Sequence, residues 1–422
     1  MSLTGEIILE DMTDAERVRA QRVEDVLPIL RESAARVDLD GAFNTDHITT
    51  LSHAGLLGLV VPEQYGGMGG SLRDLCAATF ALGTACPSTA MAYFFHCSSS
   101  SRGLLALEAI EAGLFTETEI PVVRRFAEKV LTTMGREGKW LANFASESVK
   151  SENAAITIST KAKAVSGGYL VTGVKSFGSA TGVADRYLVT AAVEGQSDGA
   201  SLATFMMNRD AKGVRERTKW DAIGMRGTAT HGLILEDVFV LDEDALAIPG
   251  AFTRSMQMSR GSFVGNQLAG TAVYAGTAWS VYRGTIDALK ARTFADTGNS
   301  ITASALHLVL VGDMMVEMET ALLWLRRQLL LETSEPPIKS KTEVVKHWRL
   351  CKGEVSEAGF KVASLALKCL GTSATTNGGH QARAFRDMAM GLVQAFPAER
   401  GRLMAAQLEF EGSEQAQFGT SK

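Results

Sequence analysis

The stretch ITISTKAKAVSGGYLVTGV, residues 156–174, decides the fold class of this chain of 422 residues. Ile156 and Ile158 before a Ser-Gly-Gly turn, and Tyr169 and Val171 after it, alternate with small or polar residues. Alternation with a period of two around a glycine turn is typical of paired β-strands with one buried face. We therefore predict strands on both sides of this turn.

The strand pattern continues after the turn and gives way to helices further out. YLVTAAV (187–193) and LATFMM (202–207) are separated by the loop GQSDGA. Elsewhere the apolar residues recur at helical spacing. We predict an α+β fold, mostly α, with an N-terminal helical domain (1–138), a middle β domain (139–248) and a C-terminal helical bundle domain (249–422).

The helical segments have clear apolar stripes. In AERVRAQRVEDVLPILRESAARV we expect Val18, Val23, Leu27, Ile29 and Leu30 to form one stripe. Two longer patterns, over 302–332 and 341–370, suit a helical bundle. Serine usually caps a helix, so we interpret the run Ser98–Ser101 as structural.

Composition excludes several function classes. Lys and Arg total 42 against 47 Asp and Glu, with a net charge of −5 and no basic run, which argues against a nucleic-acid partner. The five cysteines form no Cys-x-x-Cys pair, and the seven histidines lack the spacing of metal ligands. No signal peptide or run of 18 apolar residues occurs. We expect a cytoplasmic location without a membrane or metal partner.

Four ordered motifs resemble those of the acyl-CoA dehydrogenase superfamily. They begin with GLLGLVVPEQYGGMGGS (55–71) and continue with Ser-Glu-Ser at 146–148 and GVKSFGSATGVADRYLV (173–189). WDAIGMRGTAT (220–230) with LEDVFV and LGTSATTNGGHQARAFRDM (370–388) complete the set. Because the motifs occur in the family's order, the resemblance covers nearly the whole chain.

The resemblance implies a three-domain subunit, a middle β-barrel or sandwich, a C-terminal four-helix bundle and a homotetramer. It further implies FAD, or FMN in its place, between the β domain and the bundle. Ser146 and Ser179 match the hydroxyl positions at the flavin edges, and Phe144 and Phe177 match the ring-packing positions. Taken from the residues alone, the two serines are turn residues and the phenylalanines β-core.

For the cofactor tail, the resemblance implies Arg292 and Phe294 in ARTFAD, and Gly371 in a turn that contacts the diphosphate. Ala295 stands where the family has glycine, and Arg292 is one residue closer to the phenylalanine than usual. If Arg292 does not contact the cofactor, we expect it to be a solvated charge at a helix end.

The general base of the family is missing. Dehydrogenation of an acyl-CoA needs a carboxylate that removes the α-proton while hydride passes to flavin N5. Ala395 occupies the glutamate position, and no acidic residue occurs between Asp244 and Asp287. We interpret Glu399 as a helix-surface residue. The identity of a base is therefore left open.

Three functions remain open. The first is an FAD-dependent dehydrogenase that oxidises an acyl-CoA-type substrate at its α,β carbons with a base from another position. The second is a flavin-dependent monooxygenase or hydroxylase that uses reduced flavin and O2, with His96 as catalytic candidate. The third is a catalytically silent subunit or a non-enzymatic interaction protein. If His96 is not catalytic, we expect it to be a histidine of the hydrophobic core.

The partners follow from these functions. We expect a small-molecule or acyl-CoA substrate, a flavin reductase or electron-transfer partner, and copies of the same chain in a homo-oligomer.

Overall fold

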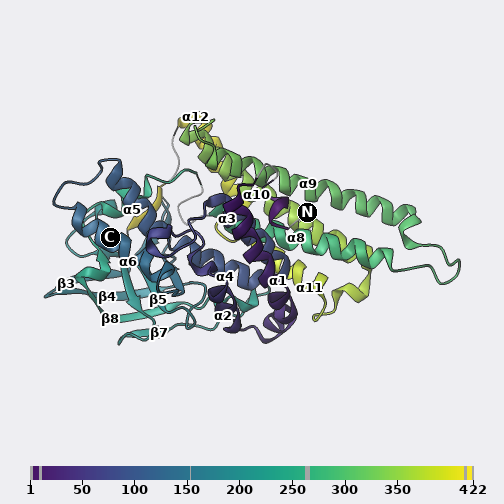
Figure 1. Cartoon of the computed structure of the whole chain (residues 1–422), viewed down its shortest axis with the longest axis horizontal. Helices are drawn as coiled ribbons and strands as arrows, with labels where there is room; N and C mark the ends of the chain where they lie inside the picture. The colour runs from purple at the N-terminus through teal and green to yellow at the C-terminus, as the bar shows by residue number, and fades with distance from the viewer. Residues whose placement is uncertain (1–2, 9–11, 153, 262–266, 413–415, 421–422) are drawn as a thin grey trace.

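The computed structural model describes all residues except 1–2, 9–11, 153, 262–266, 413–415 and 421–422. The described chain is mostly helical, with a curled sheet at one end of the molecule and long helices at the other (Figure 1). The predicted fold class is confirmed. Helices give way to strands between Gly135 and Leu141, and strands to helices between Leu246 and Ala251.

The helices before the sheet are α1 (Asp14–Asp40), α2 (Asp46–His53), α3 (Leu72–Ala85), α4 (Pro87–Ser98), α5 (Ser101–Glu111) and α6 (Ile120–Gly135). Those after it are α7 (Ala251–Met256), α8 (Gln267–Lys290), α9 (Ala305–Thr333), α10 (Lys341–Leu370), α11 (His380–Gly391) and α12 (Ala398–Glu411). The strands are β1 (Leu141–Phe144), β2 (Ala154–Ile158), β3 (Lys161–Val165), β4 (Gly168–Lys175), β5 (Arg186–Val193), β6 (Leu202–Asn208), β7 (Val214–Glu216), β8 (Leu233–Leu241), β9 (Ala245–Leu246) and β10 (Ala416–Thr420).

Helix α1 begins at a capping box, in which Thr13 and Glu16 satisfy each other's backbone N–H groups. Its buried stripe includes Val23, Leu27 and Leu30. The predicted membership of Val18 and Ile29 is wrong, because these side chains are 56% and 52% exposed. At 100° per residue both positions turn away from the face that carries the other three.

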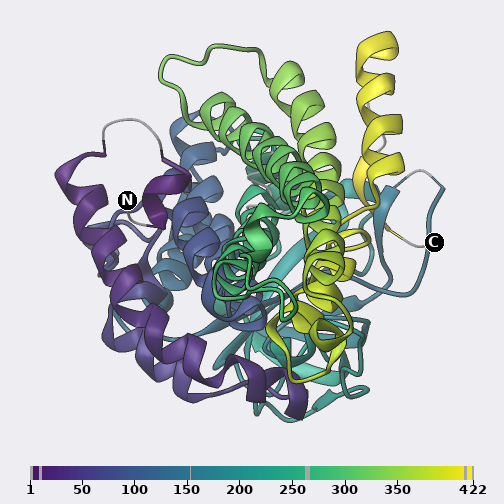
Figure 2. The same cartoon turned by 90° about the vertical axis from the view of Figure 1, so that its right-hand side faces the viewer.

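Helices α3 and α8 join the first helical region to the bundle at very close range. A Cβ on Gly83 would lie 2.6 Å from the carbonyl oxygen of Val273, and one on Gly276 would lie 2.0 Å from that of Phe80. Only glycine allows the two backbones to approach so closely. Side chains of these helices therefore share one core, and Figures 1 and 2 show the backbones of α3 and α8 side by side.

The main sheet has the order β7-β8-β4-β3-β5-β6-β9, and β1 also pairs with β5. The predicted turn is confirmed, since β3 and β4 pair antiparallel up to Val165 and Gly168. The strand that precedes the turn is Lys161–Val165, however. Ile156 and Ile158 lie in β2, which pairs in parallel with β10. A strand near the end of the chain departs from the all-helical C-terminal region that the sequence predicts.

Helices α9 and α10 begin and end close to the predicted bounds, and α9 carries exposed apolar side chains. Val309, Val316, Leu323 and Leu330 recur every seven residues and are 64%, 65%, 61% and 44% exposed. We call these four residues the α9 row. A separate finding is that no helix among the described residues is long and apolar enough to cross a membrane.

Candidate functional site

Three loops of the β domain meet at one edge of the sheet. They follow β1, β4 and β7, and they carry the residues Ser146, Ser148, Ser176, Ser179 and Thr230, which we call the hydroxyl rim. The backbone N–H of Ser176 donates to the carbonyl oxygen of Ser146 at 2.9 Å. The hydroxyls of Ser148 and Ser176 lie 2.8 Å apart. The first two loops are therefore held together at the rim.

The third loop is held by a chain of hydroxyls. Ser179 Oγ lies 3.0 Å from Thr230 Oγ1, which lies 2.7 Å from Thr228 Oγ1. Thr228 donates in turn to the carbonyl oxygen of Met225 at 2.9 Å. Ser179 is 5% exposed and lies within this chain, whereas Ser146 is exposed.

These loops concentrate unusual backbone geometry. Ala180, Met225 and Ala229 have φ values of 62°, 49° and 46°. Left-handed conformations are unfavourable for residues with a Cβ and cluster at functional sites. The backbone N–H of Ala180 donates to the carbonyl oxygen of Thr228, and that of Thr181 donates to the carbonyl oxygen of Ala229. Hydrogen bonds between the loops thus keep the strained residues in place.

The two predicted ring-packing phenylalanines differ in position. Phe177 is 52% exposed and contacts Trp220 edge to face, with 5.7 Å between the ring centroids. Phe144 is fully buried against Tyr187, and a Cβ on Gly178 would lie 2.1 Å from its ring. Phe144 is therefore a β-core residue behind the loop. The exposed Phe177 and the half-buried Trp220 form an aromatic pair beside the hydroxyl rim.

The rim has the donor set that a flavin requires. Hydroxyls can hydrogen-bond to the polar edge of the ring system, and an aromatic pair can pack against its apolar part. Ser146, Ser179 and Phe177 supply these groups from two loops that touch. The residues present therefore fit a flavin ring.

A buried ion pair supports the rim from below. Lys175 Nζ donates to Glu147 Oε1 at 2.5 Å and to the carbonyl oxygen of Thr190 at 2.6 Å. The backbone N–H groups and hydroxyls of Ser159 and Thr160 also donate to Glu147. Burial alone would raise the pKa of Glu147, but Lys175 and these donors lower it below its ordinary value.

Sequence reasoning missed this ion pair, although one signal was present. Glu147 lies inside the Ser-Glu-Ser triplet, and Lys175 ends a strand otherwise rich in apolar residues. A charge at a buried strand position needs a partner, so the lysine predicted a carboxylate nearby.

A second junction ties the third loop to the helices. Asp387 of α11 accepts the backbone N–H of Met225 at 2.6 Å, and burial raises the pKa of Asp387 to about 7. Arg386 donates to both carboxylate oxygens of Asp38 in α1, and Arg226 donates to the Asp38 carbonyl oxygen at 2.9 Å. An open cavity of ≈ 500 Å³ lies beside this junction.

His96 has the surroundings of a core histidine. It is fully buried, Nε2 donates to the carbonyl oxygen of Leu57 at 2.8 Å, and Nδ1 accepts the N–H of Leu141 at 3.0 Å. Burial lowers its pKa to about 4. A catalytic role would require one of these backbone hydrogen bonds to break. The neighbouring Ser98–Ser101 hydroxyls all donate to carbonyl oxygens of their own helical segment.

Ala395 lies at the apex of a tight turn between α11 and α12. It is exposed with φ 64°, and the N–H of Phe396 donates to the carbonyl oxygen of Gln394 at 2.9 Å, as in a γ-turn. The buried Lys352 of α10 donates to the carbonyl oxygens of Gly391 and Phe396, at 2.7 and 2.6 Å. Lys352 therefore holds both sides of this turn. Glu399 is exposed in the first turn of α12.

The residues expected at the cofactor tail lie apart from the rim. Arg292 and Phe294 lie in the loop between α8 and α9, at the end of the bundle opposite the sheet (Figure 1). Gly371 ends α10 with φ 72° and has open space where a Cβ would be. Within one chain, the structure does not bring these three residues to Ser146 and Ser179.

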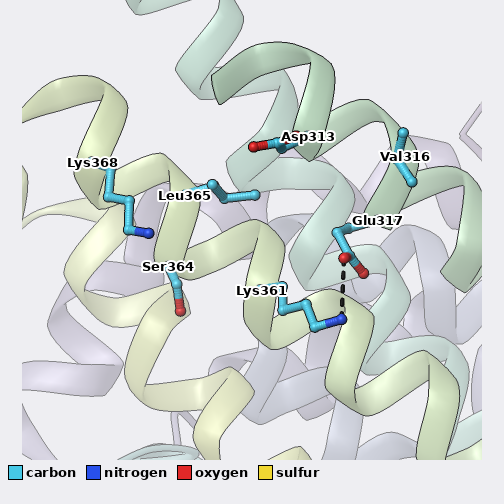
Figure 3. Close-up of a pocket in the computed structure, with 7 residues that line it drawn as sticks. All are labelled: Asp313, Val316, Glu317, Lys361, Ser364, Leu365 and Lys368. Carbon is cyan, nitrogen blue, oxygen red and sulfur yellow. Dashed lines mark hydrogen bonds and ion pairs between the residues drawn. The ribbon is translucent and has the colours of Figure 1, made fainter. Parts of the chain in front are cut away.

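A groove between α9 and α10 has a volume of ≈ 340 Å³ (Figure 3). Lys361 bridges it to Glu317 at 3.1 Å, and Asp313, Ser364 and Lys368 line it. It shares no residue with the rim. Within the described part of the chain no cluster of His, Cys, Asp or Glu could hold a metal, and all five cysteines are buried free thiols.

Two segments of the chain match models of known protein domains. Residues 15–107 match the model of the acyl-CoA dehydrogenase N-terminal domain, and residues 142–238 match that of the middle domain. L-evernosamine nitrososynthase of Micromonospora sp. is 28% identical over 53% of this chain and 50% of its own length. The match thus spans half of that relative.

Two solved structures share the fold. KijD3 in complex with FMN and dTDP-3-amino-2,3,6-trideoxy-4-keto-3-methyl-D-glucose has a TM-score of 0.78 at 23% identity and covers 96% of each chain. Butyryl-CoA dehydrogenase from Megasphaera elsdenii has a TM-score of 0.78 at 19% identity, covering 95% of this chain and 99% of its own. Residues 15–107 and 142–238 thus match the N-terminal and middle domains of the acyl-CoA dehydrogenase family, and the chain shares the fold of both solved structures.

Proposed function

We propose that this chain is a flavin-dependent monooxygenase, with the ring of FMN or FAD held at the hydroxyl rim. Its relatives are flavin-dependent oxidoreductases and oxygenases, which supports the coarser assignment. Bound flavin would supply the redox chemistry, as activated oxygen in a monooxygenase or as a hydride acceptor in a dehydrogenase. Ser146, Ser179 and Phe177 would bind and orient the ring.

The observation that carries the monooxygenase assignment is the turn at Ala395. Removal of an α-proton needs a carboxylate within hydrogen-bond reach, and a methyl group at this apex cannot accept a proton. An oxygen-transfer reaction does not need that base. The nitrososynthase relative favours the same branch, and we infer an amine, sulfur or aromatic substrate.

A dehydrogenase of acyl-CoA substrates is the second candidate. The fold likeness to butyryl-CoA dehydrogenase, over nearly the full length of both chains, favours it. In that case the base comes from a position other than 395. A flavin reductase serves the first candidate and an electron-transfer partner the second.

Stopped-flow absorbance of the flavin-loaded, chemically reduced protein separates the two candidates. We expect oxygenated buffer to produce a transient species, distinct from oxidised and reduced flavin, before reoxidation. Anaerobic bleaching of the oxidised flavin by butyryl-CoA, with no transient under oxygen, would instead identify a dehydrogenase. If neither occurs, the chain is a silent subunit.

The flavin position has its own test. Phe177→Ala removes the exposed ring of the rim, and we expect the Kd for FMN to rise by about tenfold, because stacking on an aromatic ring is lost. Phe239→Ala is the matched control, since Phe239 is 48% exposed on β8 outside the rim. Equal affinities of the two variants in a fluorescence titration would place the flavin elsewhere.

We also propose that the α9 row packs against a second copy of this chain. An antiparallel pair of α9 helices centred between residues 319 and 320 would place Val309 beside Leu330 and Val316 beside Leu323. Leu323→Lys should then lower the mass measured by light scattering, whereas an unchanged mass would exclude this surface.

A further inference from the structure

Arg102 of α5 is a buried cation that forms no ion pair with any of the described residues. Its side chain contacts α7, where Nη1 lies 3.3 Å from Met256 Sδ and Cζ lies 4.9 Å from the centre of the Phe252 ring. The residue is 6% exposed, and Nε has no hydrogen-bond partner within the described part of the chain. A guanidinium that leaves water without a carboxylate or carbonyl acceptor loses much of its solvation free energy.

A second unpartnered polar atom lies on the facing helix. Ser255 is 2% exposed, and its Oγ has no hydrogen-bond partner among the described residues. Phe252 and Met256, the two residues that Arg102 contacts, lie three positions before and one position after Ser255. Residues spaced in this way share one side of a helix, so Ser255 belongs to the part of α7 that faces α5.

The charges of the neighbouring elements are already used or lie elsewhere. Arg254 of α7 forms an ion pair with Glu119, and that carboxylate is therefore engaged. Glu108 is the nearest acidic residue on α5, but it is exposed and lies six positions, or about 9 Å of helix rise, from Arg102. Among the described residues, no carboxylate therefore pairs with the positive charge of Arg102 between the two helices.

We propose that Arg102 and Ser255 form a binding site for the carboxylate of an apolar organic acid between α5 and α7. A guanidinium presents two parallel N–H donors that match the two oxygens of a carboxylate, and a serine hydroxyl adds a third donor. The Phe252 ring and the Met256 side chain, which contact the guanidinium, are the apolar groups next to these donors. A single cation matches a monoanion, whereas a phosphate dianion would leave one buried charge unpaired.

The test titrates the full chain with benzoate, with acetate as a smaller carboxylate and with benzamide as an uncharged analogue of benzoate. We expect a carboxylate to raise the melting temperature and to give a Kd at least about tenfold below that of benzamide, because hydrogen bonds to a charged group are stronger than neutral ones. Equal binding of benzoate and benzamide, or no binding of either carboxylate, would overturn the proposal.

Two matched variants locate the site. Arg102→Met keeps an unbranched side chain without the charge, and we expect it to melt no lower than the parent without ligand but to lose at least about tenfold in benzoate affinity. Arg254→Met on α7 should melt lower, since Glu119 loses its partner, and should keep the parent affinity. Unchanged benzoate affinity in Arg102→Met would sink the proposal. Flavin absorbance is read separately, so failure of the flavin assignment does not affect this result.

Discussion

Two buried lysines support the hydroxyl rim and the turn at Ala395, and their charges are compensated in different ways. Lys175 lies under the hydroxyl rim and faces the carboxylate of Glu147. Lys352 lies under the turn at Ala395 and donates hydrogen bonds to two backbone carbonyl oxygens, and no carboxylate of the described residues accepts a hydrogen bond from it. The rim is thus built on a closed ion pair. The turn is built on a lysine whose hydrogen bonds go to backbone carbonyl oxygens, with Glu357 adding an electrostatic attraction.

The rim and the turn at Ala395 should therefore respond differently to mutation and to pH. A buried charge that forms an ion pair destabilises the fold strongly when its partner is removed. A charge held by dipoles keeps a penalty for being ionised, and burial lowers the pKa of Lys352 to about 8.

Removing the carboxylate under the rim should have the largest effect. Glu147→Gln leaves Lys175 without a counter-charge and places amide hydrogens near the donors of Ser159 and Thr160. We expect unfolding in urea to show a loss of about 3–5 kcal/mol. Glu243→Gln is the control, because that carboxylate forms an exposed pair with Lys129 and should change stability by less than about 1 kcal/mol. Similar losses for both would mean that the buried pair is not special.

Removing the dipole-held charge should have a smaller effect with a distinct pH dependence. Lys352→Met leaves two buried carbonyl oxygens without donors, and we expect a loss of about 1–3 kcal/mol near pH 7. The folded pKa of about 8 lies below the ordinary 10.5, so the unfolded chain binds more protons between these values. Stability of the parent relative to the variant should therefore rise from pH 8 to 10.5. If the stability of the parent relative to Lys352→Met fell over this pH range, the lowered pKa of Lys352 would be wrong.

Asp387 is a third buried charged group to compare. Its carboxylate accepts a hydrogen bond from the backbone N–H of Met225. Its folded pKa of about 7 lies above the ordinary 3.8, so the folded chain binds more protons across that window. Stability of the parent relative to Asp387→Asn should therefore fall as pH rises from about 4 to 7. Asp221→Asn, at an 89% exposed side chain, should reproduce the parental slope in urea titrations at each pH.

The smallest effect concerns two strained alanines, one on each side. Ala395→Gly should raise the unfolding free energy by about 0.5–1 kcal/mol, because glycine relieves the positive φ at an exposed apex. Ala180→Gly, at φ 62° but fully buried, also loses a packed methyl group and should gain less. The reverse order in thermal melts would show that Ala395 is not strained.

The sequence predicts the fold class and most long elements because their signals are local. Alternation around residues 166–168 gives the turn, and the apolar periods of α9 and α10 give helices close to the observed bounds. The assignment of Val18 and Ile29 to the stripe failed because an apolar residue is not obliged to be buried. The pairing of β2 with β10 was out of reach, since no local signal links segments so far apart.

The candidate site is predicted less completely. The motifs locate Ser146, Ser179 and Phe177, which the structure brings to one rim. They do not distinguish Phe177 from Phe144, because exposure depends on how Gly178 packs. The ion pair of Lys175 with Glu147 supports the rim, and Lys352 supports the turn. Both depend on tertiary contacts that spacing along the chain does not encode.

The pairing of β2 with β10 has a consequence for synthesis on the ribosome. Their paired residues lie about 260 positions apart, and β2 pairs with no other strand in the described chain. At about 5–20 residues per second, β2 waits roughly 10–50 s for its partner to be translated. During that interval it presents an open strand edge to other nascent chains and to chaperones. The order of translation thus makes this short strand a point of vulnerability that the finished molecule conceals.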